Sequence, residues 1–482
     1  MTNWGGLVAE FGIILILIFG ISRFRTPREG RFGNLIAALA LGLALALVVR
    51  RHHLTGLGVL VPVAVVGTVL GWLVAERVSM IRIPSLVAIQ NGAGGLASFL
   101  VSFVELVRGA GQLSPAVQVF GFFGLAVGVA TFSGSMVAAG KLDNRIRQTP
   151  VVLPRHGTIL TALAVGIFLS AVMAGVSSGS AWLIFLLCLS AFSLAAGVVF
   201  SIRIGGADMP VLISFLNSGS GLAAALCGVV IGNRLLVACG ATVAVSGFIL
   251  TQVMCRAMNR NLLSVFTGIK LKHAPSVVPA ESTLPPGATA DLAAAADSGA
   301  ASDSALSSDE VVDPLVCATE IIREAQSVII IPGYGMALAH AAPDVVALGS
   351  RLEEMGKNVR YAVHPVAGRM PGHMHVLLAE AEVDYSKLHE MSVINPLFAE
   401  TDVALVVGAC DVVNPAAAET EDTPISGMPI LLAGEARHVV VINLDDKPGY
   451  SGVPNTLYRN PNTVMLLGDA KERLKQLSAS LE

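Results

Sequence analysis

Nine long apolar segments occupy the N-terminal part of this 482-residue chain. Each has about the 20 residues of helix that a bilayer core requires. Nine in succession are too many for the buried helices of a soluble protein. Small residues are frequent in them, as in GNLIAALALGLALAL, and they let membrane helices approach closely. The sequence therefore predicts a helical membrane domain over 1–255, with spans at about 4–22, 32–49, 56–75, 83–107, 115–138, 157–176, 180–200, 208–231 and 233–254.

Lys and Arg are distributed unequally between the connections of these helices. Fifteen lie in alternate connections, beginning with the one after the first helix, and four lie in the opposite connections. Because positively charged loops stay in the cytoplasm, the N-terminus is expected outside and the C-terminal region in the cytoplasm. An odd number of helices requires the same arrangement.

The stretch that follows the last apolar segment has another composition. Residues 271–312 are rich in Ala, Ser, Pro and Asp and contain no aromatic residue. Such a segment cannot bury enough apolar surface to fold alone, so residues 256–312 are predicted to be a flexible linker. The six cysteines show neither metal-type nor paired spacing and are interpreted as reduced packing residues.

Residues 313–482 have the pattern of a soluble α/β domain. Helical patterns, among them 336–356 as one continuous helix, separate the apolar runs. The alternation predicts a parallel sheet with helices on both faces, whose ligands bind at the carboxyl ends of the strands. The runs expected as strands are SVIIIP (327–332), NVRYAV (358–363), DVALVV (402–407), HVVVIN (438–443) and TVMLL (463–467).

Glycine-bearing segments follow these strands. Gly333-Tyr334-Gly335 ends the first strand and opens a helix, which permits close backbone approach to an anion at the helix N-terminus. Taken alone, this turn is a weak signal. Further segments with Gly, Pro or Asp follow later strands at 364–374, 408–417, 445–455 and 468–470. Their shared position predicts one ligand site.

Several ordered strings carry a specific resemblance. GYGMA, HPVAGRMPGHM, GACDVVNPAA, KPGYSG and GDAK resemble the NADP(H)-binding domain of the beta subunit of proton-translocating NAD(P) transhydrogenase. The likeness covers 313–482, and the nine-helix region with ADMPVLISFLNSGSG at 207–221 fits the same family. It implies a Rossmann-like C-terminal domain on a multi-pass, proton-translocating membrane domain. It also implies the bacterial inner (plasma) membrane, with the C-terminal domain cytoplasmic.

The resemblance implies an enzyme that couples hydride transfer to proton translocation, of the Re/Si-specific class. NADP(H) is expected here and NAD(H) on the alpha subunit, because this chain has one nucleotide-binding fold and hydride exchange needs two. Hydride passes between the nucleotides, so neither a catalytic side chain nor a metal is expected. The expected partners are one or more alpha subunits, in a dimer of alpha–beta units, and the lipid bilayer, with no nucleic acid.

By the same resemblance, Tyr334 contacts the nucleotide in the first turn and Arg369 binds phosphate. Asp411 lies toward the nicotinamide end, and the loop through Gly449 and Tyr450 closes as a lid. The expected NADP(H) site comprises Gly333, Tyr334, Gly335, Val366, Ala367, Gly368, Arg369, Met370, Pro371, Gly408, Ala409, Cys410, Asp411, Val412, Gly427, Met428, Asn443, Leu444, Asp445, Asp446, Lys447, Pro448, Gly449, Tyr450, Asp469 and Ala470.

One departure from the family concerns nucleotide selectivity. The family carries a Lys-Arg-Ser string before the lid, for the 2′-phosphate of NADP, where this chain has Asn443-Leu444-Asp445-Asp446 and then Lys447. An Asp at a strand tip accepts from a ribose 2′-hydroxyl and repels a 2′-phosphate. The hypothesis is that Lys447 or Arg369 compensates, and the alternative is relaxed or NAD-preferring binding.

A second departure lies in the membrane. Some family members place a proton-transferring His where this chain has Asn91, while Asn217 matches a family Asn in a later helix. With Asp208 at a helix mouth, these residues are the expected proton pathway; the alternative for the amides is interhelical hydrogen bonding. Amides do not titrate, so the partner subunit is expected to contribute an ionisable group.

Two other classes of protein remain as alternatives. One is a membrane transporter or channel that a nicotinamide-nucleotide-sensing domain regulates, and it predicts gated flux without hydride transfer. The other is a structural membrane anchor with a degenerate fold, which the intact glycine and VNPAA strings disfavour.

Overall fold

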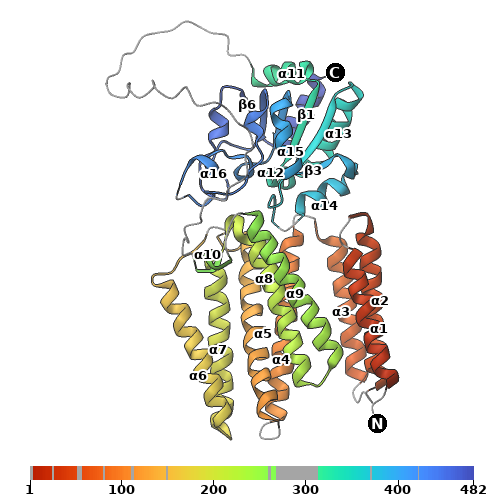
Figure 1. Cartoon of the computed structure of the whole chain (residues 1–482), viewed down its shortest axis with the longest axis vertical. Coiled ribbons are helices and arrows are strands. Elements are labelled where there is room, and N and C mark those ends of the chain that lie inside the picture. Colours follow the sequence, from red (N-terminus) through yellow and green to blue (C-terminus); the bar gives the residue numbers. More distant parts are fainter. Residues whose placement is uncertain are drawn as a thin grey trace, which may run out of the picture.

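The structure is a computed structural model of the whole chain. It describes residues 4–23, 27–51, 57–79, 82–109, 113–147, 150–258, 262–267, 313–369, 372–421 and 423–481. Most of the predicted linker and the predicted site residues Met370 and Pro371 lie outside these ranges. The described parts form a helical bundle with an α/β domain stacked on one of its ends (Figure 1).

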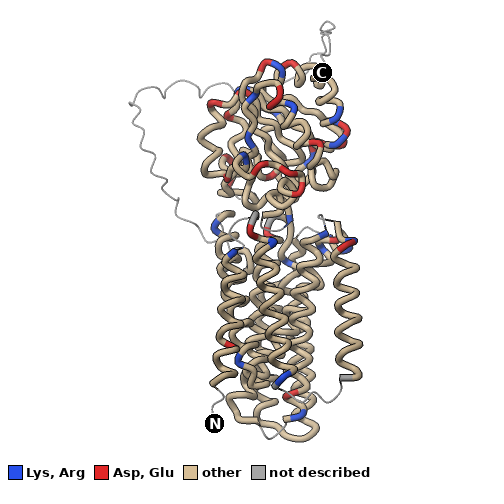
Figure 2. Tube along the Cα trace, turned by 90° about the vertical axis from the view of Figure 1, so that its right-hand side faces the viewer, with Lys and Arg blue, Asp and Glu red and all other residues tan. Residues whose placement is uncertain are grey.

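Nine helices in the described ranges are long and apolar enough to cross a membrane, which confirms the prediction. Charged residues gather at the bundle ends and over the α/β domain (Figure 2). The helices are α1 (Trp4–Ser22), α2 (Pro27–Arg51), α3 (Leu57–Arg77), α4 (Ile83–Arg108), α5 (Pro115–Leu142), α6 (His156–Val176), α7 (Ser180–Arg203), α8 (Met209–Val230) and α9 (Arg234–Ala257).

Glycines set the closest helix contacts in the bundle. A Cβ on Gly95 of α4 would lie 2.7 Å from the carbonyl oxygen of Gly128 on α5. A Cβ on Gly240 of α9 would lie 2.5 Å from the backbone nitrogen of Ala225 on α8. These backbones approach so closely because no side chain separates them, as small residues permit in membranes.

The C-terminal domain holds six parallel strands in the order β3-β2-β1-β4-β5-β6. The parallel sheet is therefore confirmed. The strands are β1 (Ser327–Pro332), β2 (Asn358–Val363), β3 (Leu388–Glu390), β4 (Val403–Val407), β5 (His438–Asn443) and β6 (Thr463–Leu467). The longer helices are α11 (Pro314–Glu324), α13 (Ala342–Glu354), α14 (His373–Glu380) and α17 (Ala470–Ser480).

The prediction of one continuous helix over 336–356 is wrong. The segment forms α12 (Tyr334–Leu338) and α13 as separate helices, with His340 between them at φ 53°. Pro343 lies at the start of α13. It has no N–H for a bond to an earlier turn, and its ring clashes with that turn, so it fits only near a helix start.

Both faces of the sheet are covered. Alternate residues of β1 point to opposite sides: Val328 and Ile330 pack under α11, α13 and α17, while Ile329 and Ile331 pack with Phe398 on the other face. This double burial explains the nearly unbroken apolar runs of the strands. Because the chain leaves β1 for β2 on one side and β4 lies on the other, the switch point of the topology falls between β1 and β4.

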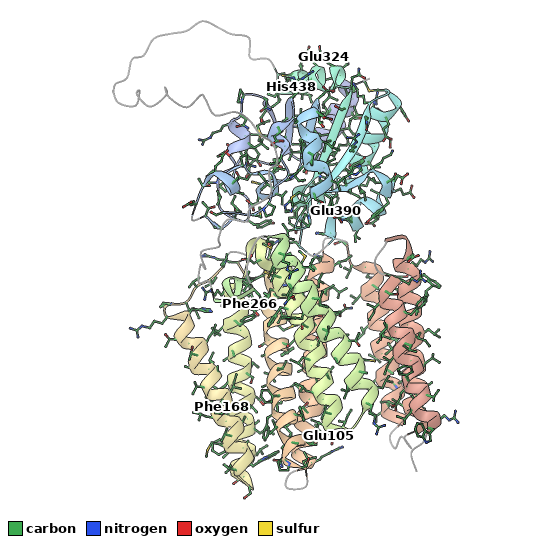
Figure 3. All side chains as sticks on the ribbon, viewed as in Figure 1. Glu105, Phe168, Phe266, Glu324, Glu390 and His438 are labelled. Atoms are coloured by element: carbon green, nitrogen blue, oxygen red, sulfur yellow. The ribbon has the colours of Figure 1, made fainter. Side chains whose placement is uncertain are left out.

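An apolar cluster joins the two domains. Ile204, Met209 and Leu212 from the α7–α8 region pack in one cluster with Val366 and Met428 of the α/β domain. Below this interface, Phe266 of α10 (Leu262–Thr267) lies at the end of the bundle that faces the α/β domain (Figure 3). Its ring contacts those of Phe200 and Phe215, with centroids 4.9 and 4.6 Å away.

Candidate nucleotide-binding site

Two glycine turns meet at the switch point of the sheet. Gly333 and Gly335 follow β1, and Gly408 follows β4 with φ 67°. The Gly335 N–H donates to the Gly408 carbonyl at 2.7 Å. A Cβ on Gly333 or Gly408 would overlap the backbone of the opposite turn. The glycines therefore leave backbone, rather than side chains, at the place where nucleotide folds bind their ligand.

Arg369 brings a permanent positive charge to this place. Its guanidinium carbon lies 4.4 Å from the ring centroids of both Tyr334 and Tyr450, and its Nη2 donates to the Tyr450 hydroxyl at 2.5 Å. The Arg369 N–H donates to Nδ1 of His373 at 3.1 Å. Burial, together with the nearby guanidinium, lowers the pKa of His373 to about 4. His373 is therefore neutral at pH 7, and Arg369 is the cation of this group.

The predicted lid is fastened to Asp411. The Asp411 carboxylate accepts from the Ser451 N–H at 3.1 Å and from the Ser451 hydroxyl at 2.5 Å. Burial raises the pKa of Asp411, against the lowering effect of these hydrogen bonds. Gly449 lies close to the same carboxylate, since a Cβ there would be 2.9 Å from Oδ1. Asp411 thus holds the segment that carries Tyr450.

The segment that departs from the family forms the rim near β5. Asn443 faces inward, and its amide donates to the Ala409 carbonyl at 3.0 Å and the Tyr458 hydroxyl at 2.6 Å. The Lys447 Nζ lies 3.0 Å from Asp445 Oδ2 in a largely exposed ion pair. The rim therefore carries a carboxylate whose charge a neighbouring ammonium offsets.

These segments line one pocket with a volume of about 290 Å³, near the lower end of the range for ligand sites. Among the described lining residues, the basic ones are Arg369 and Lys447, and the acidic ones are Asp411 and Asp445. The predicted residues that line it are Gly333, Tyr334, Gly335, Val366, Ala367, Gly368, Arg369, Gly408, Ala409, Cys410, Asp411, Val412, Met428, Asn443, Leu444, Asp445, Lys447, Pro448, Gly449 and Tyr450.

The remaining described candidates lie outside this lining. Gly427 donates its N–H to the Ala417 carbonyl at 2.8 Å, and Asp446 is exposed beyond the rim. Asp469 caps α17 by accepting from the Lys471 and Glu472 N–H groups, and Ala470 packs in the core.

Sequence reasoning missed two lining residues, Leu338 and Gly206. Gly206 belongs to the short helix η3 (Gly206–Asp208) between α7 and α8, in the membrane half of the chain. A Cβ on Gly206 would lie 3.2 Å from the Tyr450 carbonyl oxygen. No local signal could have placed it, because its position depends on the contact between the domains.

The predicted pathway residues lie on neighbouring membrane elements. Asn91 of α4 is 7% exposed and donates to the Ile213 carbonyl of α8 at 3.3 Å. Asn217 lies one turn further along α8, and a Cβ on Gly247 of α9 would be 3.2 Å from its Nδ2. Asp208 is at the start of α8, two residues from Gly206. The hydrogen bond of Asn91 therefore joins two membrane helices.

Other polar groups in the bundle escaped notice in the sequence. The Thr251 hydroxyl of α9 donates to the Ser214 hydroxyl of α8 at 3.2 Å. Glu10 in the second turn of α1 is buried, whereas Glu105 lies near the bundle end away from the α/β domain (Figure 3). Ser and Thr are too frequent in membrane helices for their spacing alone to single them out.

Fold and site together define a class: a membrane bundle that carries an α/β domain with a glycine-lined, dinucleotide-type pocket. Residues 7–480 match the family described as NAD(P) transhydrogenase beta subunit. The NAD(P) transhydrogenase subunit beta of Rhodospirillum rubrum is 38% identical over 485 residues, with 99% of each chain covered. The same subunit from a defined strain of that organism gives the same values. The chain belongs to the NAD(P) transhydrogenase beta subunit family, as its motifs predicted.

Proposed function

We propose that this subunit binds NADP(H) in the pocket at the switch point and exchanges hydride with NAD(H) held by the alpha subunit. The transfer is coupled to proton translocation through the helical bundle, which makes the complex a Re/Si-specific, proton-translocating transhydrogenase. The bundle lies in the bacterial inner membrane with the α/β domain in the cytoplasm, in a dimer of alpha–beta units.

The observation that carries this proposal is the composition of the pocket. Its backbone glycines and Arg369 suit a dinucleotide, and Gly206 of the membrane domain completes the wall. Gly333, Gly335 and Gly408 would admit the diphosphate close to the backbone. Arg369 would bind phosphate, and the segment that Asp411 fastens would cover the ligand and exclude water. The bound nucleotide supplies the hydride chemistry.

Selectivity for NADP(H) depends on Lys447 or Arg369. The Lys447–Asp445 pair is exposed, and such pairs contribute at most about 1 kcal/mol. Lys447 can therefore exchange its Asp445 contact for a more highly charged 2′-phosphate. Arg369 offers a planar fork suited to phosphate.

Binding is tested on the full chain in lipid nanodiscs, by calorimetric titration with NADPH and NADH. Tighter binding of NADPH supports the compensation by Lys447 or Arg369. A preference for NADH contradicts it, and indifference to both nucleotides contradicts the assignment of the pocket.

Hydride transfer is tested by adding the alpha subunit and following the reduction of a nicotinamide nucleotide analogue. Reduction that requires both subunits is expected. Nucleotide-gated ion flux without reduction would instead support the transporter with a regulatory nucleotide domain.

The proton route runs past Asn91, Asn217 and Asp208. The two amides cannot titrate and Asp208 lies at the mouth of α8, so the middle of the route takes an ionisable group from the alpha subunit. An alpha subunit without any His, Asp or Glu in the middle of its membrane helices would contradict this part of the proposal.

A further inference from the structure

A lysine is enclosed where the membrane bundle meets the α/β domain. Lys141, in the last turn of α5, has 0% exposure. Its Nζ donates to the carbonyl oxygens of Ile202 and Ile204, each at 2.6 Å. Burial of an ammonium group is costly unless hydrogen bonds replace its water. These two carbonyls at the C-terminal end of α7 supply such bonds, where helix carbonyls lack partners and the helix dipole is negative.

The carbonyls that Lys141 holds lead directly to the nucleotide pocket. Ile204 is the buried residue that ends α7, and Gly205 and Gly206 follow it. Gly206 has φ 60°, lines the pocket and lies against the backbone of Tyr450. Gly206, which forms this part of the pocket wall, is thus only two residues from Ile204, whose carbonyl Lys141 holds.

We propose that Lys141 is a positioning residue for the nucleotide site. Its ammonium group holds the carbonyls of Ile202 and Ile204 and thereby fixes the α7–α8 connection. In this position Gly206 contacts the backbone of the lid residue Tyr450. Lys141 itself does not line the pocket. The inference rests on the proposed function, because it takes the pocket to be the NADP(H) site.

The chain contains a matched control for the purely structural effect of such a lysine. Lys357 is also buried, at 9% exposure, and its Nζ donates to the carbonyls of Arg323 at 2.8 Å and Ala325 at 2.5 Å. These carbonyls end α11, so the bonding pattern is the same. Neither Lys357 nor α11 lines the pocket.

The test compares Lys141→Met with Lys357→Met in the full chain assembled with the alpha subunit. Lys141→Met is expected to raise the KM for NADP(H) about tenfold, which corresponds to about 1.4 kcal/mol, and to leave the KM for NAD(H) unchanged. Lys357→Met should lower the melting temperature without changing either KM. Lys141→Arg, which keeps the donors and the charge, should restore part of the affinity.

Two results overturn the inference: a wild-type KM for NADP(H) in Lys141→Met, or the same rise in both Met variants. If Lys141→Met does not assemble, Lys141→Gln takes its place with the same criteria, because the Gln side chain is neutral and one bond shorter than that of Lys. The wild-type chain separates this inference from the proposed function. If the wild type shows no saturable NADPH binding, the proposed function fails; if it binds NADPH and Lys141→Met binds equally well, only the positioning role fails.

Discussion

Arg369 is the residue to which the proposed function assigns phosphate binding. It is 5% exposed, and two tyrosine rings and a hydroxyl hold its guanidinium group. Cation–π contacts contribute about 0.5–1 kcal/mol at exposed sites and about 2 kcal/mol where the ring is desolvated; Tyr334 is half-buried and Tyr450 is 42% exposed. The contacts also fix the plane of the guanidinium, so that it is oriented before a phosphate arrives. A lysine has the same charge but neither the planar fork nor the stacking surface.

Arg369→Lys is therefore expected to weaken NADP(H) binding about tenfold, or about 1.4 kcal/mol, although the charge is retained. Titration calorimetry on the full chain in nanodiscs measures the change. Arg437→Lys is the control, because Arg437 is exposed and forms a long ion pair with Asp402 at 3.6 Å. Equal affinities of Arg369→Lys and the wild type would exclude the phosphate role.

Asp445→Asn is expected to shift selectivity toward NADPH. The change removes the rim carboxylate and leaves Lys447 without its 3.0 Å partner. A charge pair near a protein surface is worth about 1 kcal/mol or less, so the ratio of NADPH to NADH affinities should rise about threefold. The gain should shrink at high salt. Glu435→Gln, an exposed change outside the pocket, is the control, and an unchanged ratio in Asp445→Asn contradicts the prediction.

His364 gives the α/β domain a dependence on pH. Burial lowers the pKa of His364 to about 4 in the folded state, from an ordinary value of 6.5. Its Nδ1 accepts from the Val366 N–H at 3.2 Å. Between these two values the unfolded state binds the proton more readily, so stability should fall as the pH drops from about 6.5 toward 4.

Hydrogen exchange measures this dependence as protection factors of β2 amides in the full chain, corrected for intrinsic exchange. Protection should decline over that window, and His364→Gln should flatten the decline. His340→Asn is the control, since His340 is exposed and Asn tolerates its positive φ. An equal slope in His364→Gln and the wild type would assign the dependence to other groups.

At the scale of elements, the apolar runs made the nine spans and five strands predictable, because each run has the length and period that its burial requires. The edge strand β3 was not predictable. Its three residues have no apolar run and pair with β2 alone. The break between α12 and α13 could have been inferred from Pro343. The place of Gly206 in the pocket wall could not have been inferred, because it depends on contacts between segments far apart in the chain.

Gly408, in the turn after β4, should tolerate no side chain. Gly408→Ala places a Cβ into the backbone of the turn after β1 at a positive φ, so nucleotide binding should be lost and the domain destabilised by several kcal/mol. Gly452→Ala is the control: its φ is 74° but its Cβ would meet nothing within 4 Å, and it should cost only about 1 kcal/mol. Denaturation of the full chain compares the unfolding free energies of the two variants. Equal losses would mean that the positive φ alone, and not the overlap with the turn after β1, causes the destabilisation.

At the scale of the molecule, the candidate nucleotide pocket and the membrane bundle share a wall. The α7–α8 connection contributes Gly206 to the pocket and Asp208 to the start of α8. The interdomain cluster of Ile204, Met209, Val366 and Met428 surrounds this connection with apolar side chains. A change of charge at Asp208 therefore occurs within two residues of the pocket wall, and rigid packing can transmit it.

Asp208→Asn should consequently depress proton-coupled turnover more than nucleotide binding. The substitution keeps the size of the side chain but removes its ability to titrate, and the pocket lining itself is unchanged. Proton uptake and hydride transfer are measured in liposomes that hold the complex with the alpha subunit, and the dissociation constant for NADPH is measured on the same preparation. Asp143→Asn, an exposed carboxylate at the end of α5, is the control and should change neither. An equal loss of turnover and of NADPH binding in Asp208→Asn would instead assign Asp208 a structural role.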